Sequence, residues 1–169
     1  MSVANLITLS RGLAIVPIVL LLASGHRWAA WWLFGFACAT DLVDGFVARA
    51  RNEVTRLGQV LDPTVDKALY VSMLCLLFVL GDIPTAAFAL FLIPQAAIGL
   101  GAVLLRVRKN AVQQARTPGK VASALAFGAI AFLIVRWPGG VELFYMAIGA
   151  TFAGAVDYAI SAIRLMRNA

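Results

Sequence analysis

Four aspartates within an otherwise apolar stretch are the residues of this sequence best suited to chemistry. They form two pairs at helical spacing, three and four residues apart: Asp41 with Asp44, and Asp62 with Asp66. An ionisable side chain in a membrane helix is costly unless it faces a partner, a cavity or an ion. Two such helix faces, brought together, would place four carboxylates side by side, and their repulsion prevents joint ionisation without cations. The spacing therefore predicts a divalent metal site.

Small residues and one arginine accompany these acids. Gly45, Ala48 and Gly58 allow a backbone or a ligand to approach closely. Arg49 follows on the same predicted helix as the first acid pair, and its planar guanidinium is suited to bidentate phosphate binding. Metal ions and arginine beside small residues predict a substrate that carries phosphate.

The whole segment resembles the signature of the CDP-alcohol phosphatidyltransferases, D-x2-D-G-x2-A-R-x8-G-x3-D-x3-D. All eight specified positions match: Asp41, Asp44, Gly45, Ala48, Arg49, Gly58, Asp62 and Asp66. Eight residues at fixed separations make a far more specific pattern than a short glycine motif. The resemblance implies transfer of a phosphatidyl group from CDP-diacylglycerol to an alcohol with release of CMP. It also implies a six-helix fold that forms homodimers.

The resemblance assigns roles to these residues. Asp41, Asp44 and Asp62 would hold two Mg2+ or Mn2+ ions, which suit oxygen ligands better than zinc does. Asp66 would be the general base that takes the proton of the incoming hydroxyl, and would also contact a metal. The nucleotide and phosphate pocket would be shaped by Gly45, Ala48, Arg49 and Gly58.

The alcohol acceptor is less well defined by the sequence. The segments NLITLSR and VLDPTVDK are most similar to bacterial phosphatidylglycerophosphate synthases, whose acceptor is glycerol 3-phosphate. The segments IPQAAIG and VASALAF depart from the pattern of those synthases where the acceptor should bind. Inositol phosphate, phosphatidylglycerol as in cardiolipin synthesis, and another polar alcohol therefore stay open as acceptors.

A basic link near the middle of the chain bears on the same question. It has five positive charges and no acid: Arg106, Arg108, Lys109, Arg116 and Lys120. One interpretation is the positive-inside bias with attraction to anionic lipid, and the other is a rim that binds a phosphorylated acceptor. The second interpretation favours glycerol 3-phosphate. Asp157, a further acid in an apolar stretch, either pairs with a basic residue or contacts substrate.

The composition defines the elements that must position these residues. The 169 residues are 62% hydrophobic and 13% charged, where soluble proteins have about 25% charged residues. A membrane span needs about 20 apolar residues, and six stretches qualify: 4–24, 29–49, 58–80, 84–106, 118–136 and 141–164. We expect an all-α membrane protein, a single domain over 1–169 with six transmembrane helices and an N-terminal interfacial turn. The first stretch could also be a signal peptide, but NLITLSR resembles the retained N-terminal helix of the family.

The charges of the links predict the orientation in the membrane. Lys and Arg cluster after the second and fourth stretches and at the C-terminus, so both termini and the active site should be cytosolic at the cell inner membrane. Only Arg27 and Arg136, beside Asp82 and Glu142, lie in the opposite links. Four tryptophans near those links predict an aromatic belt at the headgroups: Trp28, Trp31, Trp32 and Trp137.

A divalent-cation transporter is the competing class, because membrane carboxylates around metal ions would suit it too. A transporter needs polar groups through both halves of the bilayer, yet the outward segments AAWWLFGFACA and ALYVSMLCLLFVL are almost wholly apolar. We therefore favour the enzyme. Its expected partners are CDP-diacylglycerol, a polar alcohol, the lipid bilayer and a second copy of the chain, and no nucleic acid.

Overall fold

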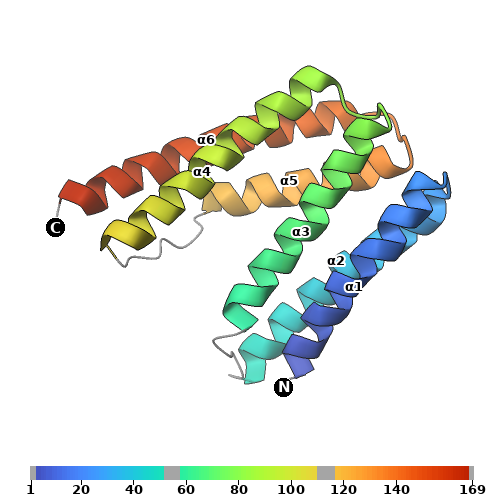
Figure 1. The fold of residues 1–169 in the computed structure, drawn as a ribbon, viewed down its shortest axis with the longest axis horizontal. Helices are drawn as coiled ribbons and strands as arrows, with labels where there is room; N and C mark the ends of the chain where they lie inside the picture. Colours follow the sequence, from blue (N-terminus) through green and yellow to red (C-terminus); the bar gives the residue numbers. More distant parts are fainter. Residues whose placement is uncertain (1–2, 52–57, 110–116, 168–169) are drawn as a thin grey trace. The chain divides into compact units, whose positions relative to one another are not determined.

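The computed structural model describes the backbone of residues 3–51, 58–109 and 117–167, and the side chains of 10–40, 65–97, 99 and 119–161. Within these residues the chain forms six helices and no strand (Figure 1). They are α1 (Val3–Ala23), α2 (Arg27–Arg51), α3 (Gly58–Val79), α4 (Thr85–Lys109), α5 (Thr117–Ile134) and α6 (Gly140–Arg167). Each lies where an apolar stretch predicted a span, so the all-α class is confirmed. The single domain over 1–169 stays a prediction.

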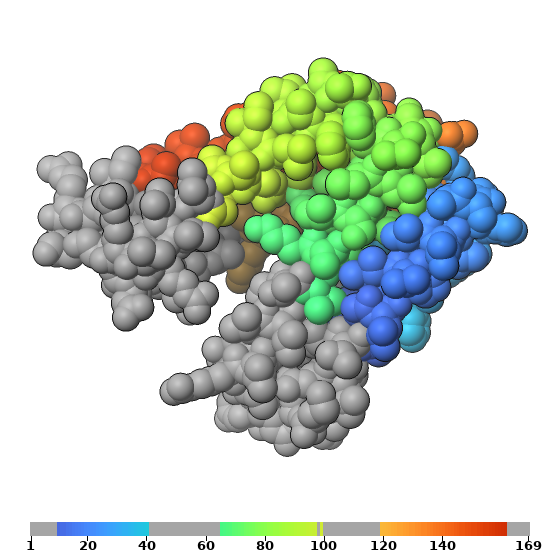
Figure 2. Space-filling view, in the orientation of Figure 1, coloured from blue at the N-terminus to red at the C-terminus, as the bar shows by residue number. Residues whose placement is uncertain are grey.

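The helices belong to two compact units. Unit 1 comprises Met1–Asp82 and Leu133–Trp137, and unit 2 comprises Ile83–Phe132 and Pro138–Ala169. In unit 1, α1 packs against both α2 and α3, and Figure 2 shows the side chains of α3 beside those of α1. The buried side chains recur every three to four residues, as one face of a helix requires: Ile18 and Leu22 on α1, Phe34 and Ala37 on α2, and Leu69, Met73 and Leu77 on α3.

Unit 2 is built on the packing of α4 along α6. Phe91 of α4 stacks on Phe144 of α6 with ring centroids 5.3 Å apart. Leu143 of α6 lies beside Gly128 of α5, where an added Cβ would be 3.6 Å from Leu143 Cδ2, an ordinary van der Waals distance. Buried aromatic rings and small residues thus hold this unit together.

Two helices of unit 1 end in a left-handed glycine. Gly25 follows α1 with φ 84° and Gly81 follows α3 with φ 75°. His26 N–H donates to Leu21 O over 2.8 Å, and Asp82 N–H donates to Leu77 O over 2.9 Å. These bonds form the Schellman arrangement that satisfies the last carbonyls of a helix. Each glycine therefore sets where its helix stops and where the following link begins.

Within the described residues, one segment is both long and apolar enough to cross a membrane, Gly140–Ser161. Shorter apolar helical segments occur at Ser10–Ala23, Thr85–Ala97 and Gly119–Ile134. The six helices are consistent with a membrane fold, and six separate crossings stay a prediction.

Candidate active site around Asp66

The predicted site residues lie on two helices of unit 1. Asp41 and Asp44 belong to α2, whereas Asp62 and Asp66 belong to α3. Helix α1 contacts both α2 and α3, so it links the two helices that carry the motif. Gly45, Ala48 and Arg49 lie on α2, and Gly58 begins α3. Apart from Asp66, the side chains of these residues lie outside the described part of the structure.

Asp66 forms an ion pair with Arg11 of α1. Arg11 Nη1 donates a hydrogen bond to Asp66 Oδ1, and this bond joins residues 55 apart in the sequence. The two partners differ sharply in exposure, because the side chain of Arg11 is 2% exposed and that of Asp66 is 34% exposed. A permanently charged guanidinium is therefore buried behind a carboxylate that reaches the surface of unit 1.

A second contact beside this pair defines how α1 meets α3. A Cβ added at Gly12 would lie 3.8 Å from Val65 Cγ1 and Cγ2, an ordinary van der Waals distance. Residues next to each other on α1 thus meet residues next to each other on α3. An alanine would therefore fit at this position without moving either helix.

Arg11 is a residue of this site that the motif does not include. Its signal was present, since it is a charged residue among the apolar residues of the first predicted span. The same argument that selected the aspartates, the cost of an unpaired charge in such a segment, applies to it. What the sequence does not contain is the partner, because that depends on the packing of α1 against α3.

The predicted metal ligands can be compared with the structure only in part. Among the described side chains, no three His, Cys, Asp or Glu residues lie close enough to hold a metal ion. Three of the four predicted ligands, Asp41, Asp44 and Asp62, are outside that set. Asp66 provides a half-exposed carboxylate, the kind of oxygen donor that Mg2+ or Mn2+ prefers. The metal site stays a prediction.

The predicted acceptor residues belong to unit 2 or lie outside the described residues. Arg106, Arg108 and Lys109 end α4, and their side chains are not among those described; Arg116 falls outside the described backbone. Lys120, near the start of α5, has an exposed side chain. Asp157 is half-buried on α6, four residues before the buried Ser161. Their roles stay predictions.

A second charged cluster, which we call the Asp82 cluster, comprises Asp82, Arg27 and Arg136. Arg27 Nη2 donates to Asp82 Oδ2 over 2.8 Å, and Arg136 Nε donates to Asp82 Oδ1 over 2.6 Å. Arg27 Nη1 also donates to Ile134 O over 3.0 Å, at the C-terminus of α5, where unsatisfied carbonyls favour a cation. In the sequence these residues are charges of separate links, but the structure joins them in one network.

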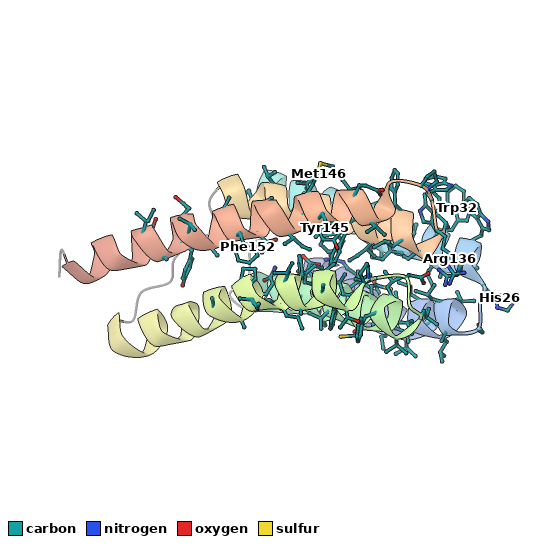
Figure 3. All side chains as sticks on the ribbon, turned by 90° about the horizontal axis from the view of Figure 1, so that it is seen from above. His26, Trp32, Arg136, Tyr145, Met146 and Phe152 are labelled. Carbon is teal, nitrogen blue, oxygen red and sulfur yellow. The ribbon has the colours of Figure 1, made fainter. Side chains whose placement is uncertain are left out.

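Four tryptophans pack together in unit 1. The ring centroid of Trp31 lies 4.8 Å from that of Trp32 and 5.7 Å from that of Trp137, and Trp28 contacts Trp31 at 6.1 Å. Figure 3 shows Trp32, Arg136 and His26 toward the same end of unit 1. The four tryptophans therefore form one cluster of rings, and the aromatic belt at the headgroups stays a prediction.

Comparison with known proteins assigns the class. The profile of the CDP-alcohol phosphatidyltransferases matches residues 1–156, so the chain belongs to this family. It is thus an enzyme of phosphatidyl transfer, from a family associated with membranes, and the resemblance drawn from the motif is confirmed.

Individual relatives refine the comparison. A probable phosphatidylglycerophosphate synthase of Mycobacterium tuberculosis is 34% identical over 96% of this chain and 82% of its own length. A CDP-diacylglycerol–glycerol-3-phosphate 3-phosphatidyltransferase of Bacillus subtilis is 31% identical over 75% of this chain and 69% of its own length. A CDP-diacylglycerol–inositol 3-phosphatidyltransferase of Saccharomyces cerevisiae is 39% identical over 32% of this chain and 24% of its own length.

Proposed function

We propose that this enzyme transfers the phosphatidyl group of CDP-diacylglycerol to glycerol 3-phosphate, forming phosphatidylglycerophosphate and CMP in a metal-dependent reaction of phospholipid biosynthesis. The observation that carries the proposal is the complete motif from Asp41 to Asp66 in a chain that matches the family over residues 1–156. The two bacterial relatives are named for this product or this acceptor and match most of the chain. Their names support glycerol 3-phosphate over other alcohols.

The residues of the motif would have separate roles in the transfer. The acceptor hydroxyl oxygen attacks the phosphorus on the lipid side of the pyrophosphate, and the bond from that phosphorus to the CMP oxygen breaks. CMP leaves with the bonding electrons, while the hydroxyl proton passes to the Asp66 carboxylate. Arg49 would grip phosphate oxygens, and Gly45 and Gly58 would leave room for the nucleotide.

The donor set fits hard divalent cations. Asp41, Asp44 and Asp62 would supply carboxylate oxygens, and the half-exposed carboxylate of Asp66 can be reached by an ion at the surface of unit 1. Two Mg2+ or Mn2+ ions, when bound, would stabilise the negative charge that develops on the phosphate oxygens. We therefore propose two such ions in each site.

The acceptor assignment also draws on the basic link. Glycerol 3-phosphate carries a phosphate that a neutral alcohol lacks, and a rim of Arg106, Arg108, Lys109, Arg116 and Lys120 would bind it by charge-assisted hydrogen bonds. The inositol phosphatidyltransferase of yeast matches a much shorter part of the chain. Inositol phosphate, which also carries a phosphate for the basic link to bind, is the second candidate, with the same chemistry at the lipid phosphorus.

A membrane location with six crossings completes the proposal. Large apolar side chains cover the outer faces of unit 1, where Leu13, Phe36 and Val79 are 70%, 67% and 76% exposed. Extended exposed apolar surface is unfavourable in water and suits lipid. With the excess of Lys and Arg in alternate links, this supports both termini and the site on the cytosolic side. A homodimer is proposed from the family resemblance alone.

The test is an assay of the purified protein with CDP-diacylglycerol, Mg2+ and a panel of alcohols, following both CMP and the lipid product. We expect CMP release with glycerol 3-phosphate, and loss of that release when EDTA removes the divalent cations. Undiminished activity in EDTA would contradict the metal-dependent mechanism. Product with inositol phosphate but none with glycerol 3-phosphate would transfer the assignment to the second candidate.

A further inference from the structure

Arg11 occupies a position that the pattern of α1 reserves for apolar residues. It shares the buried face of the helix with Ile18 and Leu22, while Leu13 and Leu20 are exposed on other faces. A charge in such a place costs several kcal/mol unless it is paired and hydrogen-bonded. An apolar residue would pack there at no such cost. A charge at this position therefore indicates that the guanidinium has a role other than packing.

The guanidinium contacts the carboxylate to which the reaction assigns the proton. Arg11 Nη1 donates to Asp66 Oδ1, one helical turn before the buried Leu69 and Tyr70 of α3. The adjacent contact of Gly12 with Val65 fixes the two helices against each other at this level. Arg11 is held by this packing, whereas the Asp66 side chain is 34% exposed and has fewer packing constraints of its own.

A hydrogen bond from a buried donor controls the direction of a carboxylate. The terminal torsion of an aspartate has a broad energy profile, so a carboxylate without a fixed donor samples many orientations. Arg11 Nη1 holds Asp66 Oδ1, and because the carboxylate is planar and its stem is short, holding one oxygen restricts the positions that the other can take. A misplacement of about 1 Å at a reacting group can lower the rate about 100-fold.

We propose that Arg11 is a positioning residue that fixes the orientation of the Asp66 carboxylate for proton transfer from the acceptor hydroxyl. This rests on the proposed function, in which Asp66 is the general base. The burial of Arg11 distinguishes it from a phosphate ligand, because a side chain 2% exposed does not present its charge to a substrate at the surface of unit 1. The role in phosphate binding that is expected of Arg49 is independent of this proposal.

The test compares Arg11→Met and Arg11→Lys with the wild type and with Gly12→Ala as the matched control. Gly12→Ala changes the same contact of α1 with α3 without touching the ion pair, and its new Cβ fits at 3.8 Å, so its kcat should equal that of the wild type. Arg11→Met should lower kcat about 100-fold and leave the KM for CDP-diacylglycerol within about 2-fold. Arg11→Lys should recover about tenfold of that loss, because an ammonium restores a charged donor without the fork.

Two further measurements separate positioning from folding. Removing one partner of an ion pair is strongly destabilising when the other charge stays buried, but here the remaining Asp66 carboxylate is 34% exposed and water can solvate it. The thermal unfolding midpoint of Arg11→Met in detergent should therefore not fall below that of the wild type. In the Asp66→Asn background, adding Arg11→Met should lower the residual kcat by less than about 3-fold, because two residues that act as one unit are not additive.

The outcomes distinguish this proposal from the assignment of the reaction. A wild-type protein that releases no CMP with any alcohol would contradict the proposed function itself. If the wild type is active, a wild-type kcat in Arg11→Met would overturn the positioning role alone. So would a full 100-fold further loss in the Asp66→Asn background, or a raised KM for CDP-diacylglycerol with unchanged kcat, which would make Arg11 a substrate contact.

Discussion

Unit 1 contains two arginine–aspartate sites, each joining residues 55 apart in the sequence, that are built in opposite ways. In the pair of Arg11 and Asp66, the cation is covered and the acid is exposed, with side chains 2% and 34% accessible. In the Asp82 cluster the acid is covered, at 5%, and Arg136 is 61% accessible. An acid enclosed by two cations serves the packing of chain segments. An acid presented by a buried cation can still act on something outside.

The surroundings of the two sites strengthen this contrast. Around Asp82, both carboxylate oxygens have an arginine partner, and Arg27 also binds the last carbonyls of α5. Arg27 thereby stabilises the C-terminus of α5, and Asp82 joins Arg27 to Arg136. Around Asp66, the ion pair joins α1 to α3, and α3 is the helix that carries Asp62 and Asp66 of the motif. The two aspartates should therefore respond differently to the same substitution.

The largest effect is expected at Asp66. Asp66→Asn keeps the shape of the side chain but removes the base, so kcat should fall by about 10²- to 10⁴-fold. The thermal midpoint should fall moderately, because the asparagine oxygen can still accept the hydrogen bond of Arg11 but no longer balances the charge of this buried guanidinium. CMP release and thermal unfolding, measured on the same preparation, check both statements. A large fall in the thermal midpoint with a modest loss of kcat would mean that Asp66 has a structural role, as we expect for Asp82.

The same substitution at Asp82 should have the converse effect. Asp82→Asn removes a buried charge that accepts hydrogen bonds from two arginines, and it should lower the free energy of unfolding by about 1.5 to 3 kcal/mol. The kcat at a temperature where the protein is folded should match that of the wild type. Glu142→Gln is the control, since it removes an exposed acid in the first turn of α6, where loss of the helix-dipole interaction should cost about 0.3 to 1 kcal/mol, less than at Asp82. A fall in kcat without a fall in midpoint would erase the contrast between the two aspartates.

Local patterns in the sequence predicted the helices and the motif well. Helix α1 runs from Val3 to Ala23 where 4–24 was expected, and α3 runs from Gly58 to Val79 where 58–80 was expected. An apolar stretch with a glycine or a polar link at its end specifies such a segment by itself. The spacing of the motif was also local enough to identify the family, which the comparison confirms.

The pairing of charges could not be predicted from the same information. Arg27, Asp82 and Arg136 were each interpreted as charges of a link, because their partners lie 54 to 55 residues away. Arg11 appeared as one cation in an apolar run, with nothing nearby in sequence to neutralise it. Which side chains meet across helices depends on the register of packing, and the hydrophobic period of one helix does not determine that register.

The smallest expected effect comes from two substitutions of Arg136, which separate the cost of its backbone conformation from the charges of the Asp82 cluster. Arg136 has φ 55°, a left-handed conformation that glycine adopts freely and a side chain disfavours. Arg136→Ala and Arg136→Gly both remove the guanidinium, and so they lose the same ion pair with Asp82. They differ in the cost of the left-handed backbone, and Arg136→Gly should be the more stable variant by about 1 kcal/mol. For a chain of this size that is about 2 to 4 °C in the thermal midpoint.

Neither variant should change kcat, because Arg136 belongs to the network in which the acid is covered. Equal midpoints for the two variants would mean that Arg136 leaves the left-handed region once its bond to Asp82 is lost, and that the ion pair holds the link in place.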